Sequence, residues 1–373
     1  MLTPHPTLLI GPSDWQAERM PRQEFTRRID ALWARDPQAE RAVVFGSSRH
    51  HAELAYFSNL IPKLGPALAL LSRSGEHRLF VGDSANMLGA ARPLTWIENV
   101  SSMQDAMAAL AAGKAGPRSL MVGADYMPPA LRRAITEALG KDASVQDATA
   151  HVWSQMRRKS RYELNAIDAA VKATGAARKA MREALMSGAG VTDVMLAGER
   201  AAGDAGAQDV RTLFSLDGGG TLRPFFVPVR QEADPLLAYL AIRRFNYWAE
   251  CFPLFTTRRE STPLQEKAWD AMGSAISAIK PGVGTSEIGQ LIAAAIHPYQ
   301  AHPITAHAFA QHMGLALDDS PHADIGAAFE EGEVYSLRVG AMEGSGAGMI
   351  CSRMFIVQAD GIVAFDDGLP EYP

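Results

Sequence analysis

One long helix predicted near the middle of the chain divides its 373 residues into two parts. Within the segment 158–186, apolar side chains recur every three or four positions, which is the spacing of the buried face of an amphipathic helix. They are Leu164, Ile167, Val171, Met181 and Leu185. Gly188 and Gly190 predict the end of the helix. Since domains commonly span about 100–200 residues, we place a boundary just before it and expect domains at residues 1–155 and 156–373.

The first 155 residues alternate apolar runs with amphipathic segments. The run 41–46, Arg-Ala-Val-Val-Phe-Gly, is typical of a buried strand that ends at a glycine. Similar runs cover 67–72, 78–81 and 119–122, and helical spacing covers 24–35, 102–112 and 128–139. This alternation predicts an α/β domain.

In the rest of the chain, strand-like runs are combined with packed helices. The runs lie at 236–243, 333–339 and 354–357, and the helices at 191–205, 263–279 and 286–296. This pattern predicts an α+β domain. A glycine-rich segment at 217–220 lacks the Lys and the Ser or Thr of a phosphate-binding loop, so we interpret it as a turn.

Charge and composition exclude several classes of protein. The 36 basic and 41 acidic residues give a net charge of −5, without the basic excess typical of nucleic-acid or membrane-surface binding. No apolar stretch reaches the roughly 18 residues of a membrane-spanning helix, and the N-terminus lacks the basic segment of a secretory signal. Cys251 and Cys351 are too few for a disulfide framework. We expect a cytoplasmic protein that binds neither nucleic acid nor membranes.

Five segments, taken together and in this order, resemble the pita-bread fold family, which includes creatinase, prolidase, Xaa-Pro aminopeptidase and methionine aminopeptidase. They are 158–164, the turn Ile-Lys-Pro-Gly-Val at 279–283, the histidine-bearing segment 311–321, and the strands 332–337 and 354–357. The resemblance implies a C-terminal pita-bread domain after a smaller creatinase-type N-terminal α/β domain. It also implies a homodimer.

Metallopeptidases of this family hold two metal ions with two Asp, one His and two Glu side chains. The resemblance places these five positions at Tyr239, Glu250, His312, Arg338 and Ser352. Only Glu250 and His312 keep a side chain suited to a metal ion. Arg338 puts a permanent positive charge where a dication would bind, and the loop after His312 is one residue shorter than the family pattern. We therefore expect no metal and no cofactor.

Three residues are the candidate catalytic groups of an enzyme that works without metal, as creatinase does. We expect His312 to transfer protons, because the pKa of an unperturbed histidine lies near neutral pH. Glu250 or Asp319 would orient His312, and Glu250 would activate water or hold a cationic part of the substrate. The alternative for His312 is a buried structural histidine that bonds a backbone carbonyl.

Arg223, Arg338 and Arg353 are predicted to bind a small anionic substrate, because guanidinium groups bind carboxylates in a bidentate way. The alternative is a structural ion network of these arginines with acidic residues. Its acidic members would be Glu250, Asp318, Asp319 and Glu343.

Other residues are expected near the substrate. Tyr247 or its neighbour Trp248 should face the cleft, and we choose Tyr247. His307 is expected to line the cleft, whereas His297 and His302 are expected in a loop or at the surface. In family dimers, the accessory domain of one subunit can cover the cleft of the other, and here Phe57 would contribute.

These residues support three functions. The first is a metal-independent, creatinase-like hydrolase that acts on a C–N bond of a small anionic nitrogen-containing metabolite. The second is a non-catalytic member of the family that binds a ligand or a protein. The third is a divergent Xaa-Pro-type metallopeptidase, which requires that the motif positions above are displaced by a residue or more.

Overall fold

The computed structural model describes residues 14–373 except 83–87, 113–117, 141–142, 218, 225–227, 230, 259, 307, 320–327 and 369–373. The described residues form two compact units, one that ends at Met156 and one that begins at Arg157. We call them the N-terminal unit and the C-terminal unit. None of the helices in the described ranges is long and apolar enough to cross a membrane.

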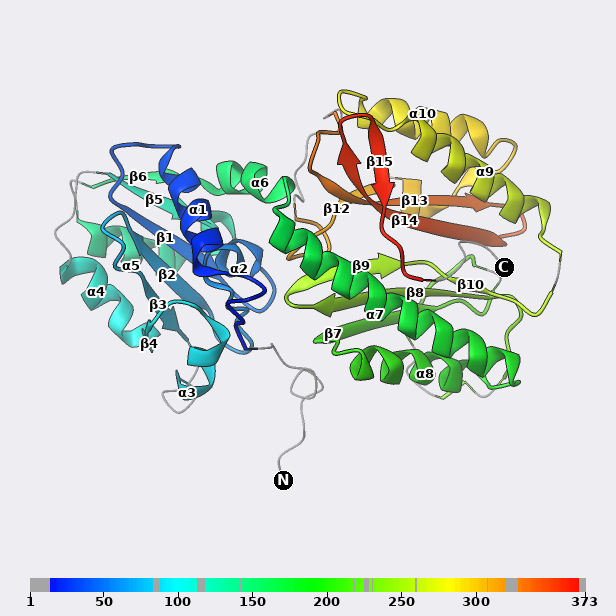
Figure 1. Ribbon diagram of the computed structural model, residues 1–373, viewed down its shortest axis with the longest axis horizontal. Coiled ribbons are helices and arrows are strands. Elements are labelled where there is room, and N and C mark those ends of the chain that lie inside the picture. Colours follow the sequence, from blue (N-terminus) through cyan, green and yellow to red (C-terminus); the bar gives the residue numbers. More distant parts are fainter. Residues whose placement is uncertain are drawn as a thin grey trace. The chain divides into compact units, whose positions relative to one another are not determined.

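The N-terminal unit is an α/β domain built on a six-stranded sheet with the order β4-β3-β2-β1-β5-β6 (Figure 1). Its strands are β1 (Arg41–Gly46), β2 (Ala67–Ser72), β3 (Arg78–Val81), β4 (Asn99–Ser102), β5 (Arg118–Val122) and β6 (Ser144–Asp147). Its helices are α1 (Arg22–Trp33), α2 (Ala52–Ser58), α3 (Leu88–Ala91), α4 (Ala106–Ala112), α5 (Pro129–Leu139) and α6 (Thr149–Arg157). The central strand β1 pairs antiparallel with β2 and parallel with β5, so the sheet is mixed.

The C-terminal unit is an α+β domain in which a pair of helices and a sheet occur twice (Figure 1). The first set contains α7 (Arg161–Met186), α8 (Val191–Asp204), β7 (Asp209–Phe214), β8 (Leu236–Arg244), β9 (Tyr247–Cys251) and β10 (Leu254–Phe255). The second contains α9 (Pro263–Ala278), α10 (Thr285–Ala295), β11 (Gln300–Ala301), α11 (Pro303–Ala306), β12 (Ala310–His312), β13 (Val334–Met342), β14 (Gly348–Gln358) and β15 (Gly361–Ala364). This is the mixed architecture expected from the sequence.

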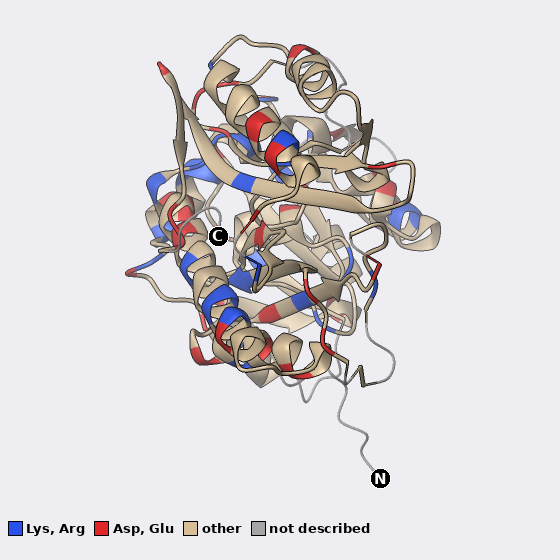
Figure 2. Ribbon diagram, turned by 90° about the vertical axis from the view of Figure 1, so that its right-hand side faces the viewer, with Lys and Arg blue, Asp and Glu red and all other residues tan. Residues whose placement is uncertain are grey.

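Local sequence explains where the two longest helices begin. The helix expected from residue 158 begins at Arg161, because Ser160 caps it: the Ser160 hydroxyl accepts from the Glu163 N–H, and the Glu163 carboxylate accepts from the Ser160 N–H. Thr262 and Gln265 form the same reciprocal pair at the start of α9. Figure 2 shows both basic and acidic residues along the helices of the structure.

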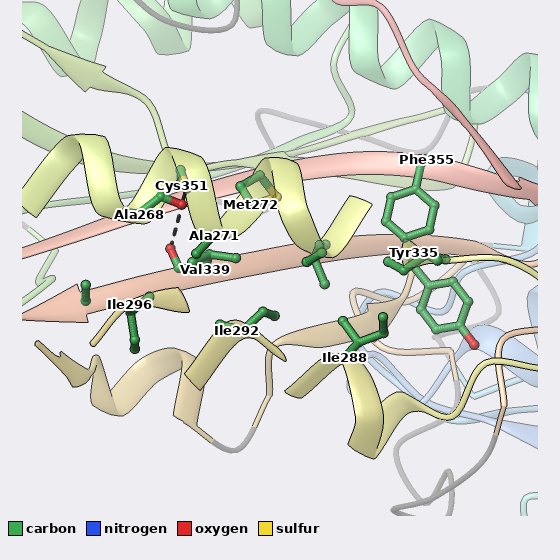
Figure 3. Close-up of a cluster of buried hydrophobic side chains, with 14 of the residues drawn as sticks. Ala268, Ala271, Met272, Ile288, Ile292, Ile296, Tyr335, Val339, Cys351 and Phe355 are labelled. Carbon is green, nitrogen blue, oxygen red and sulfur yellow. Dashed lines mark hydrogen bonds between the residues drawn. The ribbon is translucent and has the colours of Figure 1, made fainter. Parts of the chain in front are cut away.

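Each strand of the C-terminal unit has two faces, and the face that a side chain occupies decides which other residues it can contact. We call the side packed on α7–α10 the helix face and the opposite side the inner face. Ala238, Leu240 and Ile242 of β8 pack on the helix face with α7 and α8. On β13 the helix face carries Tyr335, Leu337, Val339 and Ala341, which pack with α9 and α10 (Figure 3). Side chains alternate along a strand, so Tyr239, Ser336 and Arg338 lie on the inner face.

The glycine-rich turn has a packing role. Gly219 has φ +94° and lies so close to β14 that an added Cβ would be 2.0 Å from the Gly348 carbonyl oxygen. The Gly219 carbonyl oxygen lies 2.9 Å from Nε2 of His302 and accepts its hydrogen bond. His302 lies in a loop, as one of the two expectations had it, but it is buried, with 1% of its surface exposed.

We expect Gly219→Ala to lower the free energy of unfolding by about 3 kcal/mol, because the new methyl group meets a backbone oxygen and the residue must keep a positive φ. Denaturant unfolding measures this loss. Gly273→Ala is the matched control: an added Cβ at this helical position meets nothing within 4 Å, so it should leave stability unchanged or raise it. Equal effects of the two substitutions would contradict this account of the turn.

Candidate functional site

A buried ion pair occupies the centre of the inner face. Arg338 on β13 donates two hydrogen bonds to Glu250 on β9, from Nε to Oε1 at 2.6 Å and from Nη2 to Oε2 at 2.5 Å. Tyr239 on β8 donates its hydroxyl to Oε2 of the same carboxylate at 2.9 Å. Three strands from both sheets therefore meet at one carboxylate.

Burial makes this pair rigid and nearly neutral as a unit. The side chain of Glu250 is 0% exposed and that of Arg338 is 9% exposed. Burial, together with the negative charge of Glu250, raises the pKa of the Tyr239 hydroxyl well above its usual range. Tyr239 thus stays protonated and acts as a hydrogen-bond donor. The guanidinium fork of Arg338 is already used within the protein, as in the predicted ion network.

Strand β14 completes the surroundings of the pair. Ser352 lies directly opposite Arg338 in the β13–β14 register, and its hydroxyl accepts from the Phe252 N–H at 3.0 Å. The backbone N–H of Glu250 contacts Sδ of Met354 at 3.3 Å. Four of the five positions that the resemblance assigned to metal ligands are thus close together on this face.

His312, the fifth position that the resemblance assigned to a metal ligand, does not lie on the inner face. It lies directly opposite Tyr335 in the β12–β13 register, and paired residues point to the same side of a sheet. Its ring is 4.2 Å from the Tyr335 ring, which belongs to the apolar core under α9 and α10. The prediction that His312 and Glu250 work together is therefore wrong, because the two side chains lie on opposite faces.

The environment of His312 also opposes proton transfer. Burial, with the positive charges of Arg157 and Lys159, lowers the pKa of His312 from 6.5 to about 2. The imidazole is 4% exposed, and its Nδ1 has no hydrogen-bond partner. A base with so low a pKa is almost fully deprotonated near neutral pH and accepts protons weakly.

Gln311 is the inner-face residue that the sequence analysis missed. It lies opposite Ser336, which shares its face with Arg338. Oε1 of Gln311 and Oγ of Ser336 are both buried without a hydrogen-bond partner. The shorter loop after His312 was the available signal, because a shift of one residue exchanges the two faces of a strand.

Asp319 is held in a structural ion pair. Its carboxylate is 2.9 Å from Nζ of Lys159, and both side chains are 1% exposed. It also accepts backbone N–H bonds from Leu315 at 3.2 Å and Ala316 at 2.6 Å. Gly314 is required here, because an added Cβ would be 1.7 Å from the Asp319 carboxylate. These bonds stabilise the turn after β12, and the predicted catalytic role of Asp319 is not supported.

The aromatic predictions were also wrong. The Tyr247 hydroxyl donates to Glu163 on α7 at 3.1 Å, so Tyr247 lies on the helix face. Its neighbour Trp248 is on the inner face, with the guanidinium carbons of Arg211 and Arg243 4.6 Å and 5.3 Å from its ring. Phe57 is 0% exposed, so it offers no surface to a ligand in a neighbouring subunit.

The three predicted anion-binding arginines do not form one clamp. Arg338 is paired on the inner face, whereas Arg353 lies on the helix face beside Cys351. Arg223 is exposed and pairs through its backbone with Phe214. His307 lies outside the described residues.

A cavity of about 120 Å³ lies beside Glu250, between α7, β9 and β14. Its lining includes Arg178 and Arg182 of α7, Cys251 of β9, and Ser352 and Arg353 of β14. Arg338 is not among the residues that line it.

The comparisons with known proteins identify the family. The model of metallopeptidase family M24 matches residues 165–359, which is more than half of the chain. The chain belongs to this family. Its fold is similar to that of X-Pro aminopeptidase from Thermotoga maritima, with 15% identity over 93% of this chain and 98% of that one and a TM-score of 0.75. Prolidase from Pyrococcus horikoshii is similar too, with 14% identity over 92% and 97% of the chains and a TM-score of 0.74.

A third similar structure is the His361Ala variant of Escherichia coli aminopeptidase P, with 15% identity over 94% of this chain and 96% of that one and a TM-score of 0.74. These likenesses establish the pita-bread fold of the family. No curated protein matches the sequence.

The residues present do not fit the dimetal centre that the family implies. The inner-face positions hold a phenol, one carboxylate, an amide, a guanidinium and a hydroxyl, at Tyr239, Glu250, Gln311, Arg338 and Ser352. In the described part of the chain, no three His, Cys, Asp or Glu side chains are grouped so that they could hold an ion. The guanidinium of Arg338 bonds both oxygens of the one remaining carboxylate, so a dication would have to displace it.

We expect Arg338→Met to lower the free energy of unfolding by about 3–5 kcal/mol, because it leaves Glu250 buried without its counter-charge. The double variant Glu250→Gln/Arg338→Met removes both charges and should recover most of the loss. Chemical denaturation of both variants tests this. A double variant as unstable as the single one would show that the lost packing of Arg338, rather than the unpaired charge, causes the loss.

The lowered pKa of His312 predicts a specific acid sensitivity. In the unfolded chain this group gains a proton below about pH 6.5, whereas in the folded chain it stays neutral down to about pH 2. Its contribution to stability is therefore complete above pH 6.5 and falls by up to about 1.4 kcal/mol per pH unit below it. Compared with His312→Gln, the wild type should lose stability more steeply between pH 6.5 and 4.5. Parallel curves in that range would contradict this, and parallel curves above pH 7 are the internal control.

Proposed function

We propose that this member of the M24 family binds a small anionic molecule without metal and without cleaving it. One observation carries the proposal: the ancestral metal positions are filled by the Tyr239–Glu250–Arg338 network, in which both oxygens of the only carboxylate are bonded to Arg338. The three predicted catalytic groups are each used elsewhere. Glu250 is paired with Arg338, Asp319 with Lys159, and His312 is a neutral ring on the helix face.

This proposal separates the chain from the activity of its structural neighbours. Two of the similar structures are named an X-Pro aminopeptidase and a prolidase, and the family is described as metallopeptidases. A fold by itself does not transfer an activity. A divergent metallopeptidase would need Arg338 to leave Glu250, which would leave the buried Glu250 carboxylate without its counter-charge until a metal ion replaced it.

The second candidate is a metal-independent hydrolase of a C–N bond, similar to creatinase. The observation in its favour is that Gln311 Oε1 and Ser336 Oγ are buried beside the network without a partner. Buried polar groups are normally bonded, so these atoms are suited to a substrate or to water. Such an enzyme would need a proton carrier other than His312.

We further propose, from the family resemblance, that the protein is a homodimer. The two cysteines, neither in a disulfide, support a reducing compartment such as the cytoplasm.

Metal addition tests the first proposal. A ligand that binds only the folded state raises the melting temperature. Because we propose that the wild type binds no metal, 1 mM Mn²⁺ or Co²⁺ should leave its melting temperature unchanged. The matched control is Tyr239→Asp/Gln311→His/Arg338→Glu/Ser352→Glu, which restores metal-binding side chains and should gain a metal-dependent rise. A rise in the wild type that a chelator reverses would overturn the proposal.

Turnover separates the two candidates. We expect metal-stripped protein to leave a panel of guanidino, amide and N-alkyl amino acids and Xaa-Pro dipeptides unchanged, as followed by mass spectrometry. Hydrolysis that persists with a chelator and disappears in Gln311→Leu would establish the second candidate instead.

A further inference from the structure

Two arginines and a tryptophan form a cluster on the inner face of β7, β8 and β9. In the sheet register, Asp209 on β7 lies opposite Arg243 on β8, which lies opposite Trp248 on β9. Directly paired residues point to the same side of a sheet. Arg211 is two positions after Asp209, and Trp248 is two positions before Glu250. Side chains alternate along a strand, so the whole cluster shares the face of Glu250.

Trp248 holds both guanidinium groups at this place. The guanidinium carbons of Arg211 and Arg243 lie over its ring, 4.6 Å and 5.3 Å from the centroid. The ring is fixed, because Trp248 is 1% exposed. Cation–π attraction orients an arginine over an aromatic ring, and the N–H groups at the edge of the guanidinium plane remain able to bond an anion.

The two guanidinium groups share one carboxylate. In the described part of the chain, the acidic partner of both is Asp209, whose Oδ2 lies 3.8 Å from Nη2 of Arg211 and 3.7 Å from Nη2 of Arg243. Both distances are longer than a hydrogen bond. Glu250, on the same face, is already bonded at both oxygens by Arg338. The cluster therefore carries a net positive charge, and neither fork is filled by Asp209.

Arg243 is the buried member of the cluster. Its side chain is 12% exposed, and its Nε is buried without a hydrogen-bond partner. Burial lowers the pKa of Arg243; the charge of Asp209 opposes this change and that of Arg211 adds to it. An arginine stays charged in proteins, so a bound anion would stabilise this guanidinium. The Arg211 side chain is 55% exposed, so the cluster is open to solvent on that side.

We propose that Arg211 and Arg243 together bind a small oxyanion, a carboxylate or a phosphate group, beside Trp248. The inference rests on the proposed function, because it names the anionic group of the ligand and the residues that bind it. Guanidinium forks bind such groups through paired N–H bonds. Asp209 competes with the ligand for the same N–H groups. Removal of an arginine and neutralisation of Asp209 must therefore change the affinity in opposite directions.

Calorimetric titration of the full chain tests the site, with sodium phosphate and sodium acetate as separate probes and sodium chloride at matched ionic strength as the blank. We expect saturable binding of at least one probe to the wild type, and the tighter probe identifies the group that the site prefers. Arg211→Met and Arg243→Met should each weaken binding at least tenfold. Asp209→Asn should strengthen it at least threefold, because it removes the competing carboxylate.

Arg200→Met is the matched control, because Arg200 is an exposed arginine of α8, on the helix-covered side of the sheet. It removes the same charge and should bind within twofold of the wild type. The Arg211 and Asp209 side chains are 55% and 32% exposed, so their variants remain informative even if Arg243→Met does not fold. Equal losses in Arg200→Met and Arg211→Met would overturn the site, since net charge alone would then explain binding.

The failure of the site and that of the proposed function give different results. No saturable binding to the wild type overturns the site, as does binding that Arg211→Met leaves unchanged or that Asp209→Asn weakens. None of these results involves a metal. The proposed function is overturned separately, by a chelator-reversible rise in the melting temperature of the same wild-type sample with Mn²⁺.

Discussion

The bidentate pair between Glu250 and Arg338 is the constraint on which the centre of the C-terminal unit depends. Burying either charge alone would be costly, so each side chain requires the other in one geometry. The pair connects β9 of one sheet to β13 of the other, and Tyr239 adds a bond from β8. In the metallopeptidases of this family, metal ions join carboxylates at these positions. Here the guanidinium of Arg338 connects the two strands by bonding both oxygens of Glu250.

The two-residue period of the strands then separates groups that look adjacent in the sequence. His312 and Gln311 are neighbours, yet one packs on Tyr335 under α9 and α10 and the other lies beside Ser336 on the inner face. On the helix face, His312 lies close to a second polar network. In this network Arg157 pairs with Glu333, and the Tyr335 hydroxyl donates to Glu333 at 2.6 Å. Charged residues of this unit thus form separate networks on opposite faces of the same strands.

This separation explains how a family member can keep the fold while its ancestral site changes. The helices and the apolar helix face supply most of the packing, and they are independent of which polar groups occupy the inner face.

The sequence alone determined the order of helices and strands, the α/β and α+β architectures, the family, and the presence of an arginine where a metal ligand belongs. These follow from periodicity, from turn residues and from motifs that act over a few positions. It could not determine which face His312 or Tyr247 would occupy, because one residue of register reverses the side and only pairing with Tyr335 and packing on Glu163 set it. Nor could it choose between a free and a paired Arg338, since that depends on Glu250, 88 positions earlier in the chain, and only the tertiary structure brings the two charges together out of water.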